Sequence, residues 1–352
     1  MLWPLHKLKT ALNRLYRIEH EIDNGVHTFR SHGMKWFPFL SHANSFLWLK
    51  QGQSLYNRYT KKYGRPDLIH VHSMLNAGVL ARFIQRRHGI PYVVTEHSSS
   101  FARGMLRPPQ LCTAESIARS AAQRMAVSLS LCRLLHEKLG DAAGSWIEMP
   151  NMVEQRFVNF SLPQKDKTGN LFRFISVALL TENKCVHDLI RAFAKKFPHD
   201  STVTLDIGGD GEERSRLESI AKDLGVANRI RFLGVLNRDQ VVKAMASADA
   251  FVLASRYETF GVVVIEALAL GKPVIATRCG GPDSILREQD GILVPPNDVA
   301  ALANAMHKIR LRYDHYQPSE IRSGCIARYS EEALVRRLTG IYSEVLQANR
   351  KG

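Results

Sequence analysis

The 352-residue chain lacks most of the features that mark secreted, membrane-spanning or zinc-binding proteins. Its five cysteines are scattered, their number is odd, and no Cys-x-x-Cys pair occurs, which argues against a disulfide framework and a zinc site. No stretch of about 20 residues is free of charge, so no transmembrane helix is predicted. The N-terminus has neither the uncharged apolar core nor the cleavage site of a secretory signal. Reduced thiols and a cytoplasmic location are therefore expected.

Nucleic-acid-binding signatures are absent too, although the chain is strongly basic. Its formal net charge is +15, from 48 Lys and Arg against 33 Asp and Glu. No helix-turn-helix, RNA-recognition or zinc-finger pattern occurs, so nucleic acid is not expected as a partner. The charge favours a phosphorylated ligand or an acidic membrane surface, with solubility alone as the other explanation.

What the sequence does contain is an alternation of short apolar runs with amphipathic segments. Helical spacing is found, for example, in 186–197 and 238–248. The predicted strands are 67–72, 91–96, 124–129, 173–178, 202–208, 229–234, 250–255 and 272–277. Near-continuous apolar strands separated by helices predict parallel sheets covered on both faces. The expected fold class is α/β, with two doubly wound Rossmann-like domains facing a cleft, where ligands bind beyond the carboxyl ends of the strands.

A break in this pattern divides the chain. Residues 156–170 are polar, contain Pro and Gly, and show no period, as expected for a linker. The predicted divisions are a domain at 1–155, this linker, a domain at 171–325, and an amphipathic C-terminal helix at 326–352 that packs back on the first domain.

Two glutamates separated by seven residues draw attention to the segment 255–282. Glu258 lies in the loop after the strand 250–255, and Gly261 opens a helix whose free N–H groups form an anion site. Glu266 lies inside that apolar helix, where a carboxylate is costly unless something donates hydrogen bonds to it. The two vicinal hydroxyls of a ribose are good donors for one carboxylate.

The ordinary explanation of Glu266 is that it faces water or pairs with Lys272 or Arg278. The combination with Glu258 and the Thr-Phe-Gly turn favours a role in ligand binding.

The segment E-T-F-G-V-V-V-I-E-A-L-A-L-G-K-P resembles the E-x7-E signature of the retaining glycosyltransferases of family 4, which have the GT-B fold. The glycine turn I-G-G-D-G before a helix, the strands I-R-F-L-G and A-D-A-F-V-L-A-S, the loop G-I-L-V-P-P-N-D (291–298) and the hinge M-P-N-M-V-E resemble that family in the same order. The resemblance runs from about residue 65 to the C-terminus. It implies an acceptor-side domain at 1–155 and a nucleotide-sugar-binding domain at 171–325.

The resemblance also implies roles for individual residues. Glu258 would contact the donor sugar, and Glu266 would hold the ribose of the nucleotide. The backbone amides of Phe260, Gly261 and Val262 would hold the donor sugar and its phosphates, as the helix dipole favours. Gly209, in the glycine turn, would also contact the donor.

One position departs from the family pattern. Lys184 matches the lysine that clamps the diphosphate, but Leu179 stands where the family has an arginine, and Cys185 replaces a glycine. A lysine is a point charge and cannot supply the bidentate fork of an arginine. Arg256 or Arg278 is the expected replacement, and a weaker or different donor is the alternative.

In the first domain, His97 follows the strand 91–96 and resembles the family's active-site histidine, near the donor sugar. Ser98 and Arg103 are expected on the acceptor side. His70 and His72 are interpreted as residues that pack in the sheet or support the site. No carboxylate or cysteine is spaced to complete a metal site with them, and the fold class needs no divalent metal, so none is assigned.

The family normally opens with a strand and a glycine-bearing loop, and no apolar strand-like run occurs in the first 20 residues. The segment 24–34 looks like a later strand of the first domain, so the chain is expected to lack the first βα unit. The basic segment 1–18 is either an amphipathic contact with anionic lipid or a remnant whose packing partner is missing.

The resulting prediction is a metal-independent retaining hexosyltransferase without a cofactor. It would transfer a sugar from a nucleotide-diphosphate sugar to a glycan or lipid-linked acceptor in bacterial surface polysaccharide biosynthesis, in the cytoplasm or at the inner membrane face. The alternatives are a sugar-nucleotide epimerase of the same architecture and a catalytically silent, truncated paralogue that acts as a binding protein.

Overall fold

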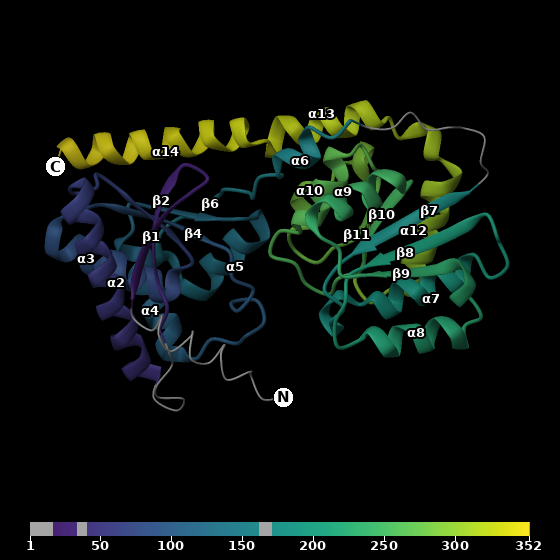
Figure 1. Cartoon of the computed structure of the whole chain (residues 1–352), viewed down its shortest axis with the longest axis horizontal. Helices are drawn as coiled ribbons and strands as arrows, with labels where there is room; N and C mark the ends of the chain where they lie inside the picture. Colours follow the sequence, from purple (N-terminus) through teal and green to yellow (C-terminus); the bar gives the residue numbers. More distant parts are fainter. Residues whose placement is uncertain (1–16, 34–40, 162–170, 352) are drawn as a thin grey trace.

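The computed structural model describes residues 17–33, 41–161 and 171–351, and it shows two α/β units side by side (Figure 1). Among these residues, the first unit has a four-stranded sheet in the order β3-β4-β5-β6, and the second a six-stranded sheet in the order β12-β11-β10-β7-β8-β9. Every neighbouring pair in both sheets is parallel. The predicted α/β class, built on parallel sheets, is confirmed.

The strands are short and apolar, as expected where helices cover both faces. Those of the first sheet are β3 (Ile69–His72), β4 (Tyr92–Glu96), β5 (Gln123–Ala126) and β6 (Ile147–Glu148). Those of the second are β7 (Phe172–Val177), β8 (Val203–Gly208), β9 (Ile230–Gly234), β10 (Ala250–Leu253), β11 (Val274–Thr277) and β12 (Gly291–Val294). The sequence did not predict β6, and the assignment of 291–298 to a loop was wrong, because Gly291–Val294 pairs with β11 at the sheet edge.

A strand does form within the segment 24–34, as the sequence predicted, but it does not join the four-stranded sheet. The strand β2 (Val26–Ser31) pairs antiparallel with β1 (Ile18–Asp23) in a separate two-stranded sheet. The turn between them is Asn24-Gly25, with both residues at positive φ (50° and 83°). Asn-Gly is the preferred pair for a two-residue hairpin turn, and this local signal determines the pairing.

The helices alternate with the strands. Those of the first unit are α2 (Ser41–Tyr63), α3 (Val79–His88), α4 (Pro108–Ser120) and α5 (Leu129–Leu139). The short α6 (Gln155–Val158) follows β6. Those of the second unit are α7 (Val186–Lys196), α8 (Arg214–Asp223), α9 (Arg238–Ser247), α10 (Val262–Ala269), α11 (Pro282–Ile285) and α12 (Val299–Leu311), and two C-terminal helices follow, α13 (Pro318–Tyr329) and α14 (Glu331–Lys351). None of the helices in the described ranges is both long and apolar enough to cross a bilayer.

The strand order of the second sheet places its ligand-binding edge. The chain builds β7, β8 and β9 in one direction and then returns to add β10 on the other side of β7. The connection from β7 therefore leads to β8 on one side of the sheet, and the connection from β10 leads to β11 on the other. This reversal opens a crevice at the carboxyl ends of these two strands, where doubly wound sheets bind ligands.

The two units share apolar packing and a long helical arm. One buried cluster extends from the first sheet through Phe157 of α6 to α10 of the second unit. Helix α14 crosses from the second unit to the first (Figure 1), where Leu338, Tyr342 and Val345 pack near Val93 of the first sheet. Part of the predicted linker, 162–170, and the basic segment 1–16 lie outside the described residues.

Candidate active site

The loops that follow β7 and β10 meet at the crevice of the second unit. The amide of Arg256 donates to the carbonyl of Asn183 (2.8 Å), and the side-chain amide of Asn183 donates to the carbonyl of Tyr257 (3.0 Å). Asn183 and Tyr257 are 74 positions apart in the chain, so these bonds join two distant segments. The chemistry of both loops is therefore concentrated at one point.

Lys184 and Glu258 form an ion pair at this junction. The Nζ of Lys184 lies 2.6 Å from Oε1 of Glu258, and the hydroxyl of Ser255 donates to the same oxygen (2.7 Å). The Lys184 side chain is 25% exposed and that of Glu258 is 14% exposed, so both remain open to a ligand on one side. The sequence assigned these residues separately, to phosphate and to sugar, and the structure brings them together.

The Thr-Phe-Gly turn leads directly into α10. Phe260 is buried and packs edge-to-face on Tyr329 of α13, with ring centroids 5.9 Å apart. Gly261 caps the helix at a φ of 93°, which favours glycine, and Val262 is the first helical residue. The free N–H groups at the start of α10 therefore directly follow the loop that holds Glu258.

The segment after β11 braces this turn. A Cβ atom on Gly281 would lie 2.1 Å from the carbonyl oxygen of Phe260, so no larger residue fits there without displacing the turn. The amide of Gly281 donates to the carbonyl of Glu258 (2.9 Å). The position of Glu258 therefore depends on a glycine more than twenty residues later in the chain.

The glycine turn after β8 lies against the loop after β7. Gly209 has a φ of 123°, and a Cβ there would lie 1.8 Å from the carbonyl oxygen of Ala178. The amide of Leu180 donates to the carbonyl of Asp210 (2.9 Å). Gly209 is thus required by the close crossing of the two loops. Leu179, between the crossing points, is 66% exposed where the family pattern has an arginine.

Glu266 is fully buried, and its partner is a residue that the sequence did not suggest. Its side chain is 1% exposed, and Oε1 lies 2.5 Å from Nη2 of Arg238, the first residue of α9. Oε2 is buried without a hydrogen-bond partner. Burial raises the pKa of Glu266, and the contact with Arg238 opposes this rise. The ordinary explanation, in which Glu266 faces water or pairs with Lys272 or Arg278, does not hold, because its side chain is buried and pairs with Arg238.

In the first unit, Glu96 shapes the loop that carries His97 and Ser98. This carboxylate is 1% exposed, and its Oε1 accepts bonds from the amides of His97 and Ser98 (both 2.8 Å). Its Oε2 accepts from the amide of Met74 (2.9 Å). Arg103 is exposed further along the same loop, and its amide bonds to the carbonyl of Ser99 (3.0 Å).

His97 forms a cluster with the two histidines of β3. Its Nε2 lies 2.9 Å from Nδ1 of His72, and the His72 ring stacks on that of His70 with centroids 4.3 Å apart. Burial, and then the neighbouring His72, lower the pKa of His97, while a hydrogen bond with Asn151 raises it. An imidazole with a lowered pKa is neutral at neutral pH, so His97 can both donate and accept a hydrogen bond.

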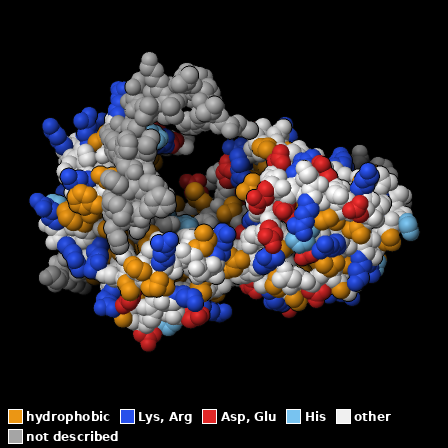
Figure 2. Space-filling model, turned by 90° about the horizontal axis from the view of Figure 1, so that it is seen from below, with side chains coloured by type: hydrophobic (Ala, Val, Ile, Leu, Met, Phe, Trp, Pro, Cys, Tyr) orange, Lys and Arg blue, Asp and Glu red, His pale blue; other side chains and the backbone are white. Residues whose placement is uncertain are grey.

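Helix α5 links the first unit to the Thr-Phe-Gly turn. The hydroxyl of Ser128, its N-cap, donates to the carbonyl of Thr259 (2.6 Å). Ser128 follows β5, and His97 follows the adjacent β4, so both lie at the same edge of the first sheet. Figure 2 shows the molecule hollowed between the two units, with acidic and basic side chains at the wall of the second.

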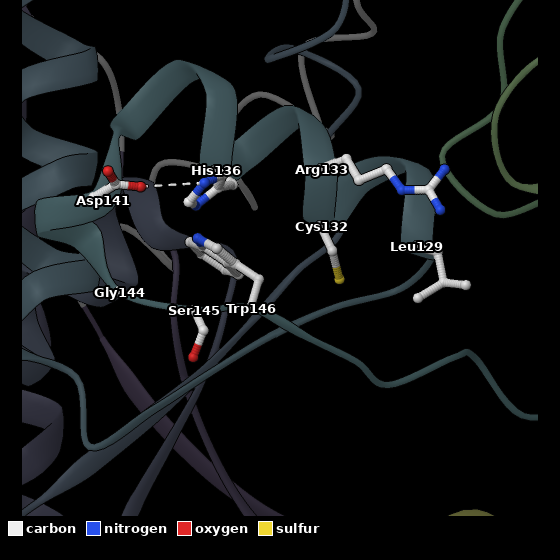
Figure 3. A pocket seen from close by; sticks show the side chains of 8 residues that line it. All are labelled: Leu129, Cys132, Arg133, His136, Asp141, Gly144, Ser145 and Trp146. Carbon is white, nitrogen blue, oxygen red and sulfur yellow. Dashed lines mark ion pairs between the residues drawn. The ribbon is translucent and has the colours of Figure 1, made fainter.

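A separate pocket of about 450 Å³ lies beside α5 (Figure 3). Its lining includes Cys132, Arg133 and Trp146, and an ion pair of 3.2 Å between His136 and Asp141. No residue that the sequence assigned to the active site lines this pocket.

Cys185, His187 and Asp188, at the start of α7, place one ligand atom each within 4.8 Å of one another. They are neighbours in sequence, and the cationic Lys184 precedes them. The sequence assigned no metal to them, and the arrangement by itself does not call for one.

Two families match the chain. The one described as Glycosyl transferases group 1 matches residues 159–317, which contain the junction of the loops and both glutamates. The one described as Glycosyl transferase 4-like domain matches residues 21–147. The chain belongs to the group 1 glycosyltransferases.

By structure, this glycosyltransferase is similar to sucrose-phosphate synthase from Thermosynechococcus elongatus, with a TM-score of 0.74 and 22% identity over 94% of this chain and 86% of that one. It is also similar to Anabaena HepE in complex with UDP, with a TM-score of 0.72 and 22% identity over 87% and 90% of the two chains. These likenesses give the fold, which is GT-B as the sequence predicted.

By sequence, this glycosyltransferase is 28% identical over 292 residues to the glycogen synthase of Mycobacterium tuberculosis (strain CDC 1551 / Oshkosh), covering 80% of this chain and 68% of that protein. It is 38% identical over 136 residues to LpsE, a lipopolysaccharide core biosynthesis glycosyltransferase of Rhizobium meliloti, which covers 38% of each protein. Some of its relatives, such as LpsE, are thus named for polysaccharide biosynthesis.

Among the residues of this candidate site that sequence reasoning missed, three are instructive. Glu96 ends an apolar strand, which is the same signal that singled out Glu266, so it could have been found. Ser128 follows the end of β5, and ligands bind beyond the carboxyl ends of such strands, so it too could have been found. Arg238 opens an ordinary surface helix in the sequence, and nothing local connects it with Glu266.

Proposed function

We propose that this glycosyltransferase is a retaining, metal-independent hexosyltransferase that uses a nucleotide-diphosphate sugar. The observation that carries the proposal is the junction after β7 and β10, where Lys184 lies 2.6 Å from Glu258 beside the start of α10. A cation and a helix N-terminus suit a diphosphate, and carboxylates suit sugar and ribose hydroxyls. Glu266 retains one buried oxygen without a partner, which a ribose hydroxyl would satisfy.

In the proposed reaction, charge builds on the departing diphosphate. Lys184 exchanges its contact with Glu258 for the phosphate oxygens, and the amides of Phe260, Gly261 and Val262 donate to the donor's sugar and phosphates. Glu258 is then free to accept hydrogen bonds from the donor sugar. Gly209 allows the backbone after β8 to approach the donor closely.

The first unit supplies the other side of the site. Neutral His97 orients the donor sugar, and Ser98 and Arg103 line the acceptor side. The acceptor hydroxyl attacks from the face that the diphosphate leaves, which retains the anomeric configuration. Closure of the two units over the donor excludes water, so that the acceptor rather than water receives the sugar.

The cation missing at Leu179 is proposed to come from Arg256. Its backbone is bonded to Asn183, next to Lys184, and its guanidinium lies 3.7 Å from Glu182 with half of its side chain exposed. Arg278, the other candidate, bonds through its amide to Val294 of β12, on the far side of β11 from the junction. Arg256 is therefore the better placed of the two.

The proposed acceptor is a glycan or a lipid-linked glycan in bacterial surface polysaccharide assembly. LpsE is named for lipopolysaccharide core biosynthesis, and HepE was solved with UDP and with UDP-glucose. A cytoplasmic protein of net charge +15 that touches the anionic inner membrane face would meet a lipid-linked acceptor there.

The first test is binding of UDP and GDP by calorimetry to the wild type and to Lys184→Gln and Glu266→Gln. Each variant removes one charged contact with the nucleotide, and we expect each to weaken binding about tenfold or more. Glu332→Gln, which alters an exposed glutamate of α14, is the matched control and should bind as the wild type does. Unchanged affinity in both site variants would contradict the assignment of the donor site.

A product assay separates the alternatives. The donor sugar that binds is incubated alone and then with lipid-linked or glycan acceptors, and products are identified by NMR and mass spectrometry. Transfer with retained anomeric configuration supports the proposal, and an epimerised donor without acceptor supports the epimerase. Tight binding with neither product points to a silent binding protein.

A further inference from the structure

Arg238 contacts two carboxylates from two other parts of the chain. Its Nη2 lies 2.5 Å from Glu266 of α10, and its Nε lies 2.8 Å from Glu154, which precedes α6 in the segment between the two sheets. Its guanidinium also lies over the ring of Phe157, 5.0 Å from the centroid. One arginine thus connects α9, α10 and the segment that joins the two units.

The burial of the three charges is unequal. Glu266 is 1% exposed, Glu154 is 39% exposed and Arg238 is 45% exposed, each figure for the side chain. A carboxylate as buried as Glu266 stays ionised only with a nearby cation or strong donors. Arg238 is the cation in contact with it, so the charge of Glu266 depends on this one residue.

The other charged groups near Glu266 do not replace Arg238. Glu154 is an anion, and it adds to the rise in the pKa of Glu266. Arg156, on α6, is directed to Glu154 and to Asp239. On α13, which packs against α10, the polar groups bond to backbone carbonyls of α10 instead: Arg322 to Ala269 and Cys325 to Ile265.

We propose that Arg238 is a positioning residue of the nucleotide site, which keeps Glu266 ionised and holds it by Oε1 so that Oε2 is left to accept a hydrogen bond from a ribose hydroxyl. This inference rests on the proposed role of Glu266 in binding the nucleotide. Because Oε2 is closed to solvent, a hydroxyl that reaches it forms its bond in a dry environment, where the charge on the acceptor matters most. Arg238 itself touches Glu266 and not the reacting atoms.

The loss of Arg238 has a pH signature that a structural role would not produce. Without the arginine, only burial and Glu154 act on Glu266, so its pKa rises further and the side chain becomes protonated as the pH falls. A neutral carboxyl accepts hydrogen bonds less strongly than a carboxylate. Nucleotide affinity in the variant should therefore fall with decreasing pH more steeply than in the wild type.

The experiment measures UDP and GDP affinity by calorimetry at pH about 8.5 and about 6 for the wild type, Arg238→Gln and Glu266→Gln. The nucleotide's own phosphate titrates in the same way in both measurements. Its effect on Kd therefore cancels in the ratio of variant to wild-type Kd at each pH. For Arg238→Gln we expect this ratio to grow by about tenfold between the two pH values, because more of Glu266 is protonated at the lower pH. For Glu266→Gln the ratio should be large at both, because glutamine has no charge to lose.

Two further variants separate charge from packing. Arg156→Gln removes the neighbouring arginine of the same network, which does not touch Glu266, and should leave the ratio near one at both pH values. Arg238→Lys keeps a positive charge and should abolish the added pH dependence. If Arg238→Gln does not fold by circular dichroism, Arg238→Met keeps the alkyl stem against Phe157 and takes its place.

The outcomes are distinguishable. If Glu266→Gln binds UDP and GDP as the wild type does, the proposed role of Glu266 fails. If Glu266→Gln weakens binding but the Arg238→Gln ratio is the same at both pH values, the proposed function stands and this inference is overturned. A Lys variant with the same pH dependence as the Gln variant would also overturn it, because charge would then not be the cause.

Discussion

Among single residues, the histidines beside β4 show how burial determines protonation. Nδ1 of His70 lies 2.5 Å from the hydroxyl of Tyr342, and its Nε2 lies 2.8 Å from the hydroxyl of Thr95. Burial, and then His72 and His97, lower the pKa of His70 from 6.5 to about 4. The ring is thus neutral at neutral pH, with one nitrogen donating and the other accepting. Three imidazoles in contact cannot all carry charge at once.

This cluster predicts a loss of stability in acid. A histidine whose pKa is lower in the folded chain than in the unfolded chain binds its proton more readily when unfolded, so stability is complete above pH 6.5 and falls as the pH drops toward about 4. His70→Gln removes the contribution of this histidine to the pH dependence of the free energy of unfolding. Because the ring is part-exposed, we expect the acid-dependent loss to shrink by about 1–2 kcal/mol.

Urea unfolding of the wild type and of His70→Gln at several pH values between neutral and acid tests this. His136→Gln, at a solvent-exposed histidine paired with Asp141, is the matched control. Parallel pH profiles for the wild type and His70→Gln would show that His70 does not titrate as stated.

At the scale of elements, the candidate active site depends on backbone loops that cross so closely that no side chain fits between them. Gly281 has ordinary helical angles (φ −59°, ψ −49°), so its requirement is space and not backbone freedom. Gly340, in α14, has no heavy atom within 4 Å of where its Cβ would lie. The two glycines therefore predict opposite results for the same substitution.

Gly281→Ala should destabilise the protein by about 1–3 kcal/mol, because the new methyl group overlaps the Phe260 carbonyl and the turn must move. It should also weaken UDP and GDP binding, since that turn carries Glu258 and the amides of α10. Gly340→Ala should stabilise the protein by about 0.5–1 kcal/mol through helix propensity alone and leave binding unchanged. Denaturant unfolding and calorimetry measure both effects, and equal effects of the two substitutions would contradict this account of the loop crossing.

At the scale of the whole molecule, α14 is the element that ties the end of the chain to its first half. Leu338, Ile341 and Val345 pack near Met125 and Met149 of the first unit, and the guanidinium of Arg337 bonds to the carbonyl of Glu148 (2.7 Å). The first sheet has four strands in the described residues, against six in the second. The arm thus covers apolar surface of the smaller sheet.

Leu338→Asp should therefore destabilise the first unit by about 2–4 kcal/mol, because it places a charge against that apolar surface. Hydrogen exchange resolved by peptide should show faster exchange in β4 and β5 and little change in β7 and β8. Arg336→Gln, on the exposed side of the same helix, should alter neither. Uniform loss of protection across both sheets would mean that the two units unfold together.

The prediction from sequence was best where the signal is local. The apolar runs predicted eight strands near their true bounds, and the spacing of Glu258 and Glu266 led to the correct family and to the loop after β10. The hairpin at residues 18–31 was missed although its Asn-Gly turn is a local signal, because β1 is polar and exposed. The edge strands β6 and β12 were missed because each is only two to four residues long.

The sequence by itself determined the α/β alternation, the family, and the placement of the candidate residues on strand ends, because these follow from periodicity and from short motifs. The tertiary structure alone decided which of them meet: Lys184 with Glu258, Glu266 with Arg238, and His97 with His72. Such pairs depend on the order of strands within each sheet and on how the loops and helices of one unit pack together. That order arises from packing between distant segments, and no local pattern in the chain encodes it.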